Sequence, residues 1–146
     1  MSQATESLAI ALISEILTVD QLSRAQLTKV LPKGMELSQF SVLNHLAAHG
    51  GERTPAQLAR VFHLTRGAMT NTLSKLEWNG WVHIRPDWDD ARRKLVSLSP
   101  PGRAARDAAV AAIVPLMSDI TARVGEEKVR QLLPVLRELR VKLSES

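Results

Sequence analysis

The segment Thr65–Trp78 combines small, polar and basic side chains at helical spacing. Mainly apolar residues recur at every third or fourth position, so one face of a helix here is predicted to pack on a core. These residues are Met69, Thr72, Leu73 and Leu76. The opposite face carries groups that can approach the edges of DNA bases, whereas a merely solvated helix usually carries more Glu and Lys pairs. The residues of this segment predicted to meet DNA are Thr65, Arg66, Gly67, Thr70, Asn71, Ser74 and Lys75.

Two β-prone stretches follow, Trp81–Arg85 and Lys94–Leu98, separated by turn-forming residues 86–91. This pattern predicts a β-hairpin with a long tip. An arginine at such a tip can enter a narrow minor groove, where the negative potential is enhanced. Asp90 stands two residues before Arg92 and can hold its guanidinium by a charge-assisted hydrogen bond. Other cations of the hairpin are predicted to meet phosphates, which position a protein without specifying sequence; they are Arg85, Arg93 and Lys94.

The positive charge of the chain is concentrated in this region. The formal net charge is +4, and residues 60–103 alone carry 8 basic and 4 acidic side chains. A local basic face is typical of proteins that bind polyanions. The alternative is a solvated surface that happens to be basic.

The elements that must position these residues are mostly helices. They are indicated by apolar residues at spacings of three or four, by Ser and Thr caps, and by Gly and Pro at the ends. Pro115 and Pro134 fall inside the last two helices, so each is predicted to bend there. The predicted helices are Thr5–Leu31 with Thr5 as its cap, Ser38–His49, a short helix opened by Thr54 and Pro55, a helix capped by Thr65 that ends near Trp78, a helix capped by Ser99 that ends near Val124, and Glu126–Leu143.

A helix, a short turn, a second helix and then a hairpin form the winged helix-turn-helix arrangement. Between Leu37 and Gly102 the chain resembles the MarR (multiple-antibiotic-resistance regulator) family of transcriptional regulators. The resemblance rests on Leu58-Ala59, on Leu64-Thr65-Arg66, on the run LSKLEWNGWV at 73–82 and on the run DWDDARRKLVSLS at 87–99.

This resemblance implies a mainly α fold, with a two-stranded β-hairpin wing and an all-helical dimerisation region. It implies an N-terminal dimerisation helix in residues 1–34, a DNA-binding lobe in 35–100 and C-terminal dimerisation helices in 101–146. It makes Arg92 the minor-groove residue and Asp90 its support. It further implies a homodimer that represses transcription from a pseudo-palindromic double-stranded DNA operator and responds to a small lipophilic or aromatic effector.

Two residues depart from the family pattern. His63 stands in the turn where relatives often have glycine, so a strained backbone is expected there. Trp81 replaces the usual leucine before the strand, and core filling is expected of it rather than base stacking.

Three other functions compete with this interpretation. His45 and His49 lie four residues apart on one predicted helix, the spacing of a zinc pair, which would suit a metal-responsive regulator of the same fold, but no further ligand stands at a matching position. An enzyme is disfavoured because the chain has no nucleophile elbow, phosphate loop or zinc-protease motif. The acids Asp87, Asp89 and Asp90 are expected to be solvated wing charges. A winged-helix module used only for protein contact is the third alternative.

The composition sets further limits. The chain contains no cysteine, which excludes disulfides and thiolate zinc sites. Its apolar stretches are too short to span a bilayer, and its first residues lack the pattern of a secretory signal. We therefore expect a cytoplasmic protein with no cofactor, no bound metal and no membrane partner.

Overall fold

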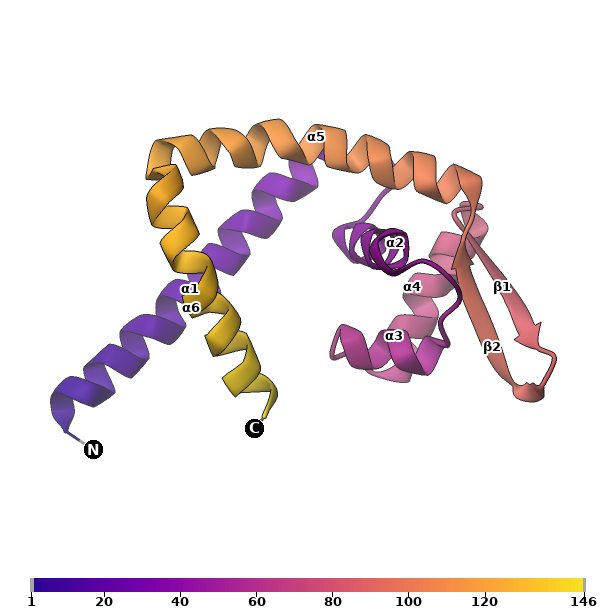
Figure 1. Cartoon of the computed structure of the whole chain (residues 1–146), viewed down its shortest axis with the longest axis horizontal. Helices are drawn as coiled ribbons and strands as arrows, with labels where there is room; N and C mark the ends of the chain where they lie inside the picture. The colour runs from indigo at the N-terminus through magenta and orange to yellow at the C-terminus, as the bar shows by residue number, and fades with distance from the viewer. Residues whose placement is uncertain (1, 146) are drawn as a thin grey trace. The chain divides into compact units, whose positions relative to one another are not determined.

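The computed structural model describes residues 2–145. These residues form helices and one two-stranded antiparallel sheet (Figure 1). The chain divides into two compact units, one ending at Val110 and the other beginning at Ala111. The predicted mainly helical fold with a hairpin is confirmed. In chain order the elements are α1 (Gln3–Val30), α2 (Leu37–His49), α3 (Pro55–Val61), α4 (Arg66–Trp78), β1 (Val82–Asp87), β2 (Asp90–Leu98), α5 (Pro100–Val124) and α6 (Glu126–Ser144).

The core of the first unit lies between α2, α3, α4 and the hairpin. Its largest fully buried apolar side chains are Leu43, Leu46, Leu58, Met69, Leu76 and Val96. The inward face predicted for α4 is confirmed, since Met69, Thr72, Leu73 and Leu76 are all buried. Because these residues anchor α4 to the core, the opposite face of the helix is left to solvent.

Side-chain caps determine where several helices begin. The hydroxyl groups of Thr54 and Thr65 each accept the backbone N–H three residues later at 3.1 Å, which confirms both as caps. The prediction that Thr5 caps the first helix is wrong. Ser2 is the cap, and its hydroxyl accepts the backbone N–H of Thr5 at 3.2 Å, so Thr5 already lies within the first turn.

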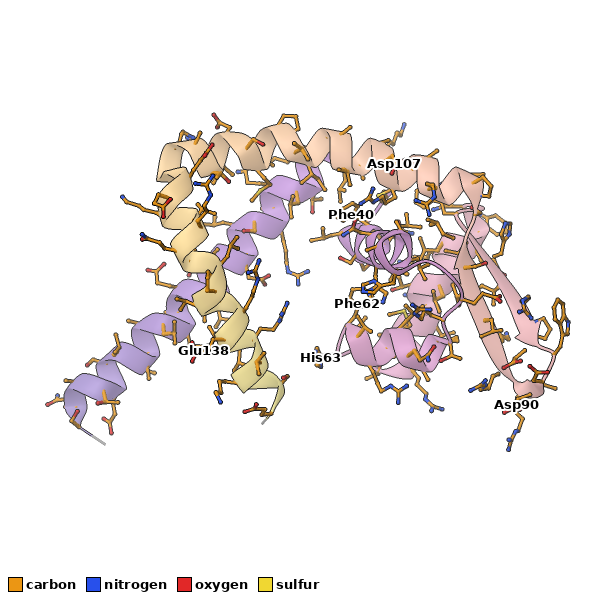
Figure 2. All side chains as sticks on the ribbon, viewed as in Figure 1. Phe40, Phe62, His63, Asp90, Asp107 and Glu138 are labelled. Atoms are coloured by element: carbon orange, nitrogen blue, oxygen red, sulfur yellow. The ribbon has the colours of Figure 1, made fainter. Side chains whose placement is uncertain are left out.

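The turn between α3 and α4 contains the strained residue that the sequence predicted. His63, labelled in Figure 2, has a φ of 53°, the sole positive φ of a non-glycine residue within the described range 2–145. Two backbone hydrogen bonds close this turn, from His63 N–H to the carbonyl of Arg60 at 3.3 Å and from Leu64 N–H to that of Ala59 at 2.9 Å. The short connection holds α4 against α3.

The hairpin is longer, and its turn tighter, than predicted. The strands run to Asp87 and from Asp90, so only Trp88 and Asp89 form the turn, and the predicted long tip over residues 86–91 is wrong. Proline and aspartate are poor strand formers, but the pairing of Asp87 with Asp90 extends the ladder through them. Pro86 pairs with Lys94, so residues 91–93 have no partner on β1 and form a bulge.

The base of the hairpin is joined tightly to the start of α5. The buried Ser99 donates its hydroxyl to the carbonyl of Gly80 at 2.6 Å and accepts the N–H of Gly102 at 3.0 Å. Gly102 lies so close to the backbone of Trp81 that a β-carbon would overlap the Trp81 carbonyl. Trp81 is half-buried at this junction, which agrees with the core-filling role expected of it.

The long helices leave much apolar surface uncovered within the chain. Neither α1 in the first unit nor α6 in the second has a buried residue. Pro115 and Pro134 lie inside α5 and α6, and the bends expected there stay predictions. The exposed apolar residues include Leu8, Ile10, Leu12, Leu17 and Leu22 in α1, and Leu132, Leu133, Val135, Leu136 and Leu143 in α6.

Across residues 2–145, no helix taken singly has the length and hydropathy of a membrane span. The helices α5 and α6 have the length and hydropathy of a span only when they are taken as a pair, and this pair is bent by 103° at its break.

Candidate nucleic-acid interface

The outward face of α4 holds the residues that the sequence predicted to meet DNA. All of them are exposed: Thr65, Arg66, Gly67, Thr70, Asn71, Ser74 and Lys75. Gly67 has open space around it, with no heavy atom within 4 Å of the position that a β-carbon would take. Lys75 donates to the carboxylate of Glu36 at 3.1 Å, an exposed pair that water screens strongly. The helix therefore offers a small-residue surface that another molecule can approach closely.

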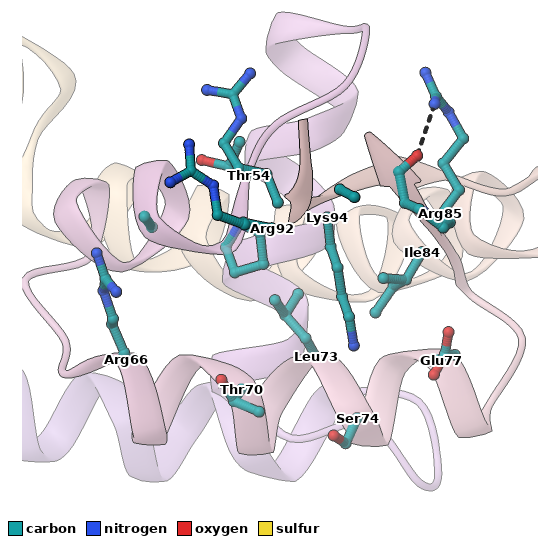
Figure 3. A pocket seen from close by; sticks show the side chains of 15 residues that line it. Thr54, Arg66, Thr70, Leu73, Ser74, Glu77, Ile84, Arg85, Arg92 and Lys94 are labelled. Atoms are coloured by element: carbon teal, nitrogen blue, oxygen red, sulfur yellow. Dashed lines mark hydrogen bonds between the residues drawn. The ribbon is translucent and has the colours of Figure 1, made fainter. Parts of the chain in front are cut away.

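A groove of about 770 Å³ separates α4 from the wing, which we define as β1, β2 and their turn (Figure 3). Its floor and walls come from the first unit alone: Thr54, Pro55, Ala56, Arg66, Thr70, Leu73, Ser74, Glu77, Ile84, Arg85, Pro86, Ala91, Arg92, Arg93 and Lys94. Figure 3 shows Lys94 extending from β2 toward α4. Among the described residues, neither Arg66 nor Lys94 has a carboxylate within ion-pair distance. The groove thus carries positive charge that the chain does not neutralise.

The bulge in β2 projects Arg92 away from the protein. Its side chain is 91% exposed, while the carboxylate of Asp90 accepts from the Arg92 Nε at 3.1 Å and from Nη2 at 3.4 Å. Asp90 also accepts the backbone N–H of Arg92 at 3.1 Å, so one carboxylate orients both backbone and side chain. These bonds to the guanidinium and the backbone lower the pKa of Asp90. The contact predicted between Asp90 and Arg92 is confirmed.

Asp87 was expected to be a solvated acid, and that expectation is wrong. It is buried at the tip of the wing, where its carboxylate accepts the backbone N–H of Asp89 at 3.0 Å and the Arg93 Nη2 at 2.8 Å. The bond from Arg93, together with the backbone bonds, lowers the pKa of Asp87. Arg93, predicted to contact phosphate, is thereby tied to the wing, although its side chain stays 56% exposed. An aspartate side chain often accepts the backbone N–H two residues later in a turn. The sequence could therefore have indicated that Asp87 bonds to the amide of Asp89.

Arg85 was also predicted to meet phosphate, but the structure engages its guanidinium within the chain. Its Nε and Nη2 donate to the two carboxylate oxygens of Glu52 at 2.7 Å each, and Nη1 donates to the carbonyl of Pro86 at 3.0 Å (Figure 3). The guanidinium also lies 4.1 Å from the ring centroid of Trp88. Sequence reasoning missed Glu52, because it lies 33 residues from Arg85 and no local pattern links them.

Replacing Asp87 tests its structural role. We expect Asp87→Asn to keep the helical fold and the turn bond from the Asp89 amide, which an asparagine carbonyl still accepts. It should release Arg93, because the NH2 group that replaces Oδ2 cannot accept from a guanidinium. The wing amides should therefore lose protection in hydrogen exchange, and duplex binding should weaken severalfold. Because folding lowers the pKa of Asp87, the stability from its ionised form is complete above the ordinary value of 3.8 and is lost as pH falls through the lowered pKa. In the parent protein, protonation of Asp87 at low pH should loosen the wing. Asp87→Asn has no carboxyl group to protonate at this position, so its wing protection should depend less on pH in this range.

Asp89→Asn is the matched control, since it removes the same charge from the exposed side of the same turn. Equal loss of wing protection in both variants would contradict the role given to Asp87.

The two histidines weighed as a metal pair stack on each other. The rings of His45 and His49 lie 4.2 Å apart, and Phe62 meets His45 edge-on at 5.6 Å. Burial, and then the nearby charges of His49 and Arg53, lower the pKa of His45. Within residues 2–145, no three His, Asp or Glu side chains lie together so that they could hold a metal ion.

A helix beside a hairpin, joined to the preceding helix by a short turn, defines a winged helix-turn-helix protein (Figure 1). Residues 33–93 match the model of the MarR family. The multiple antibiotic resistance protein MarR of Salmonella typhimurium is 36% identical over 73 residues, which are 50% of this chain and 50% of that protein. The chain thus spans about half the length of the curated relatives it matches.

Solved structures extend the similarity to nearly the whole chain. The transcriptional regulator BldR from Sulfolobus Solfataricus is similar with a TM-score of 0.83 and 25% identity, over 97% of this chain and 99% of that one. A mutant of MarR from E. coli, solved in complex with operator DNA, has a TM-score of 0.81 and 27% identity, over 95% and 99% of the two chains. The chain thus resembles the MarR family in sequence over residues 33–93 and resembles solved MarR structures in fold over nearly its whole length.

Proposed function

We propose that this protein is a homodimeric transcriptional regulator that binds double-stranded DNA and represses transcription from a pseudo-palindromic operator. One observation carries the proposal. The groove between α4 and the wing places the unneutralised Arg66 and Lys94 beside Arg92, which the bulge projects and Asp90 orients. Unpaired cations around a helix with a small, polar face suit a DNA major groove, and an oriented tip arginine suits the adjacent minor groove.

The site residues divide by the kind of contact proposed for them. Arg66, Thr70, Asn71 and Ser74 contact base edges, and Gly67 and Thr65 allow the start of α4 to approach closely. Lys75, Arg93 and Lys94 contact phosphates. Lys75 does so after leaving Glu36, and Arg93 does so through the exposed part of its guanidinium while Nε and Nη2 stay bonded to Asp87. Arg92 enters the minor groove with Asp90 as its support. Arg85 is assigned no phosphate here, because Glu52 and Pro86 occupy its donors.

The dimeric assembly rests on the uncovered apolar helices. Residues 1–34 and 101–146 form the dimerisation region in this proposal, and residues 35–100 form the DNA-binding lobe. Apolar side chains such as Leu8, Leu17 and Leu136 are 43–71% exposed in the single chain. Large apolar patches on a chain of this size are typical of interfaces, and a two-fold dimer would cover the same faces on both copies.

The comparisons support this function rather than catalysis. Because the E. coli relative was solved in complex with operator DNA, we propose that this chain also binds operator DNA. We propose no enzymatic activity. We retain the small lipophilic or aromatic effector that the family resemblance implies, as a compound that shifts the affinity for DNA.

Selection of duplexes from a random pool tests the function. We expect enriched sequences to be pseudo-palindromes with half-sites about 10 base pairs apart, since two recognition helices related by a dyad lie about one turn of DNA apart. Sedimentation should show a dimer when free and two chains for each bound duplex. Affinity should fall steeply as salt increases, because phosphate contacts release counterions.

A stable monomer at micromolar concentration, or enriched sites without symmetry, would contradict the dimer. Failure to retain any duplex, with the fold intact, would instead favour a winged-helix module for protein contact.

A further inference from the structure

The wing turn displays a large aromatic side chain that the proposed site leaves unused. Trp88 is one of the two residues of the turn and is 81% exposed. Tryptophan has the largest apolar surface of any residue, and an indole is seldom left in water without a partner to cover it. At this position it does not stabilise the core of the lobe.

The exposed indole is nevertheless held in place. The guanidinium of Arg85 lies 4.1 Å from its ring centroid, and Glu52 fixes that guanidinium with two bonds of 2.7 Å. Glu52 precedes Arg53, whose backbone forms a β-bridge with Val96 of β2, so the support is anchored in the lobe. The positive charge of Arg85 is thus balanced by Glu52 and one face of the indole is covered, while most of the side chain stays open to solvent.

We propose that Trp88 is a further DNA-contacting residue, whose indole packs on the sugar–phosphate backbone beside the minor groove that Arg92 enters. This inference rests on the proposed function. Trp88 stands two residues from Asp90, which orients Arg92, so both side chains belong to one hairpin tip. The indole offers an apolar face for deoxyribose and an N–H donor for a phosphate oxygen. Arg85 and Glu52 act as positioning residues that hold the ring ready before DNA arrives.

The pairing of Arg85 with Glu52 explains why the guanidinium supports the indole of Trp88 and does not itself contact DNA. Without Glu52 the Arg85 guanidinium would be free to pair with a phosphate. Neutralised by Glu52, it instead serves as a flat support for the indole, and ordering the ring in advance reduces the entropy lost on binding.

The test uses full-length protein labelled with 5-fluorotryptophan and a duplex enriched from the random pool. The chain has three tryptophans, so single Trp→Phe variants assign the three fluorine resonances. On DNA binding, the solvent isotope shift of the Trp88 resonance should fall severalfold. Trp78 is the internal control, being 90% exposed but at the far end of α4.

Affinity measurements complete the test. Trp88→Ala should weaken binding about tenfold. Trp88→Phe should keep most of the parent affinity because a flat ring remains. Glu52→Gln should give a smaller defect, and the Trp88 fluorine resonance of the free protein should narrow as the ring gains motion.

If Arg92→Ala weakens binding while Trp88 keeps its solvent isotope shift and Trp88→Ala binds as the parent does, this inference is overturned and the proposed function stands. If the parent protein binds no duplex, both are overturned. If Trp88→Ala is poorly folded, the fluorine measurement on the parent protein still decides.

Discussion

Arg92→Ala should weaken binding of the enriched duplex by about tenfold to a hundredfold for each wing. The effect is large because 91% of the Arg92 side chain is exposed on the bulge and two hydrogen bonds to Asp90 direct its guanidinium. The loss should be greatest on duplexes whose flanks have a narrow minor groove, since an inserted arginine gains most where the potential is most negative. Binding isotherms on A-tract and mixed-sequence flanks measure this difference.

Variants of other residues separate this effect from a general loss of charge. Arg123→Ala removes one cation from the second unit, where Arg123 pairs with Asp119 at 3.1 Å, and should leave affinity nearly unchanged. Lys94→Ala should weaken all duplexes alike and reduce the salt slope by about one for each contact. Asn71→Ala should instead relax specificity at one base pair. Asp90→Ala should give a milder form of the Arg92 defect, because the arginine remains but is less well directed.

The wing assignment fails if Arg92→Ala binds the enriched duplex as tightly as the parent protein at every salt concentration.

Gly102→Ala should lower the free energy of unfolding by about 2–4 kcal/mol. A β-carbon at this position would overlap the backbone carbonyl of Trp81, and backbone cannot rotate away as the end of a side chain can. Relieving the overlap would also stretch the bonds through which Ser99 joins Gly80 to the start of α5. Denaturant titration measures the change, and a thermal scan should show a midpoint lower by about 10 °C.

Gly67→Ala is the matched control for the stability measurement. Gly67 also lies in the first turn of a helix, but it is exposed and nothing stands within 4 Å of its missing β-carbon. Its replacement should leave stability unchanged or raise it by less than about 1 kcal/mol, because alanine favours helix over glycine. Equal stability of Gly102→Ala and the parent protein would show that the junction with Trp81 is not tightly packed.

Several parts of the site could be predicted from the sequence because their causes are local. The inward face of α4 follows from residue spacing, so Met69 and Leu76 were identified without a structure. Thr54 and Thr65 cap helices through bonds that span three residues. The bond between Asp90 and Arg92 spans two residues. The positive φ of His63 was expected from the family resemblance, since relatives often have glycine at this position of the turn.

At the wing, the sequence did not predict which residues of the two strands pair with each other. The turn-forming residues 86–91 favoured a long tip, yet Asp87 and Asp90 pair and shorten it to Trp88 and Asp89. The bulge that projects Arg92 exists only because Pro86 pairs with Lys94 while Asp87 pairs with Asp90. Composition does not determine which residues stand opposite one another, so this geometry could not be read from the chain.

The sequence by itself thus determined the helices, their caps, the basic hairpin and the family resemblance, all of which depend on residues close together in the chain. The tertiary structure decided what the wing cations do. Burial of Asp87 ties Arg93 to the turn, and Glu52, 33 residues away, engages Arg85 and places it under Trp88. Contacts between distant residues form only once the fold has closed the intervening chain, and no local preference encodes which carboxylate meets which guanidinium.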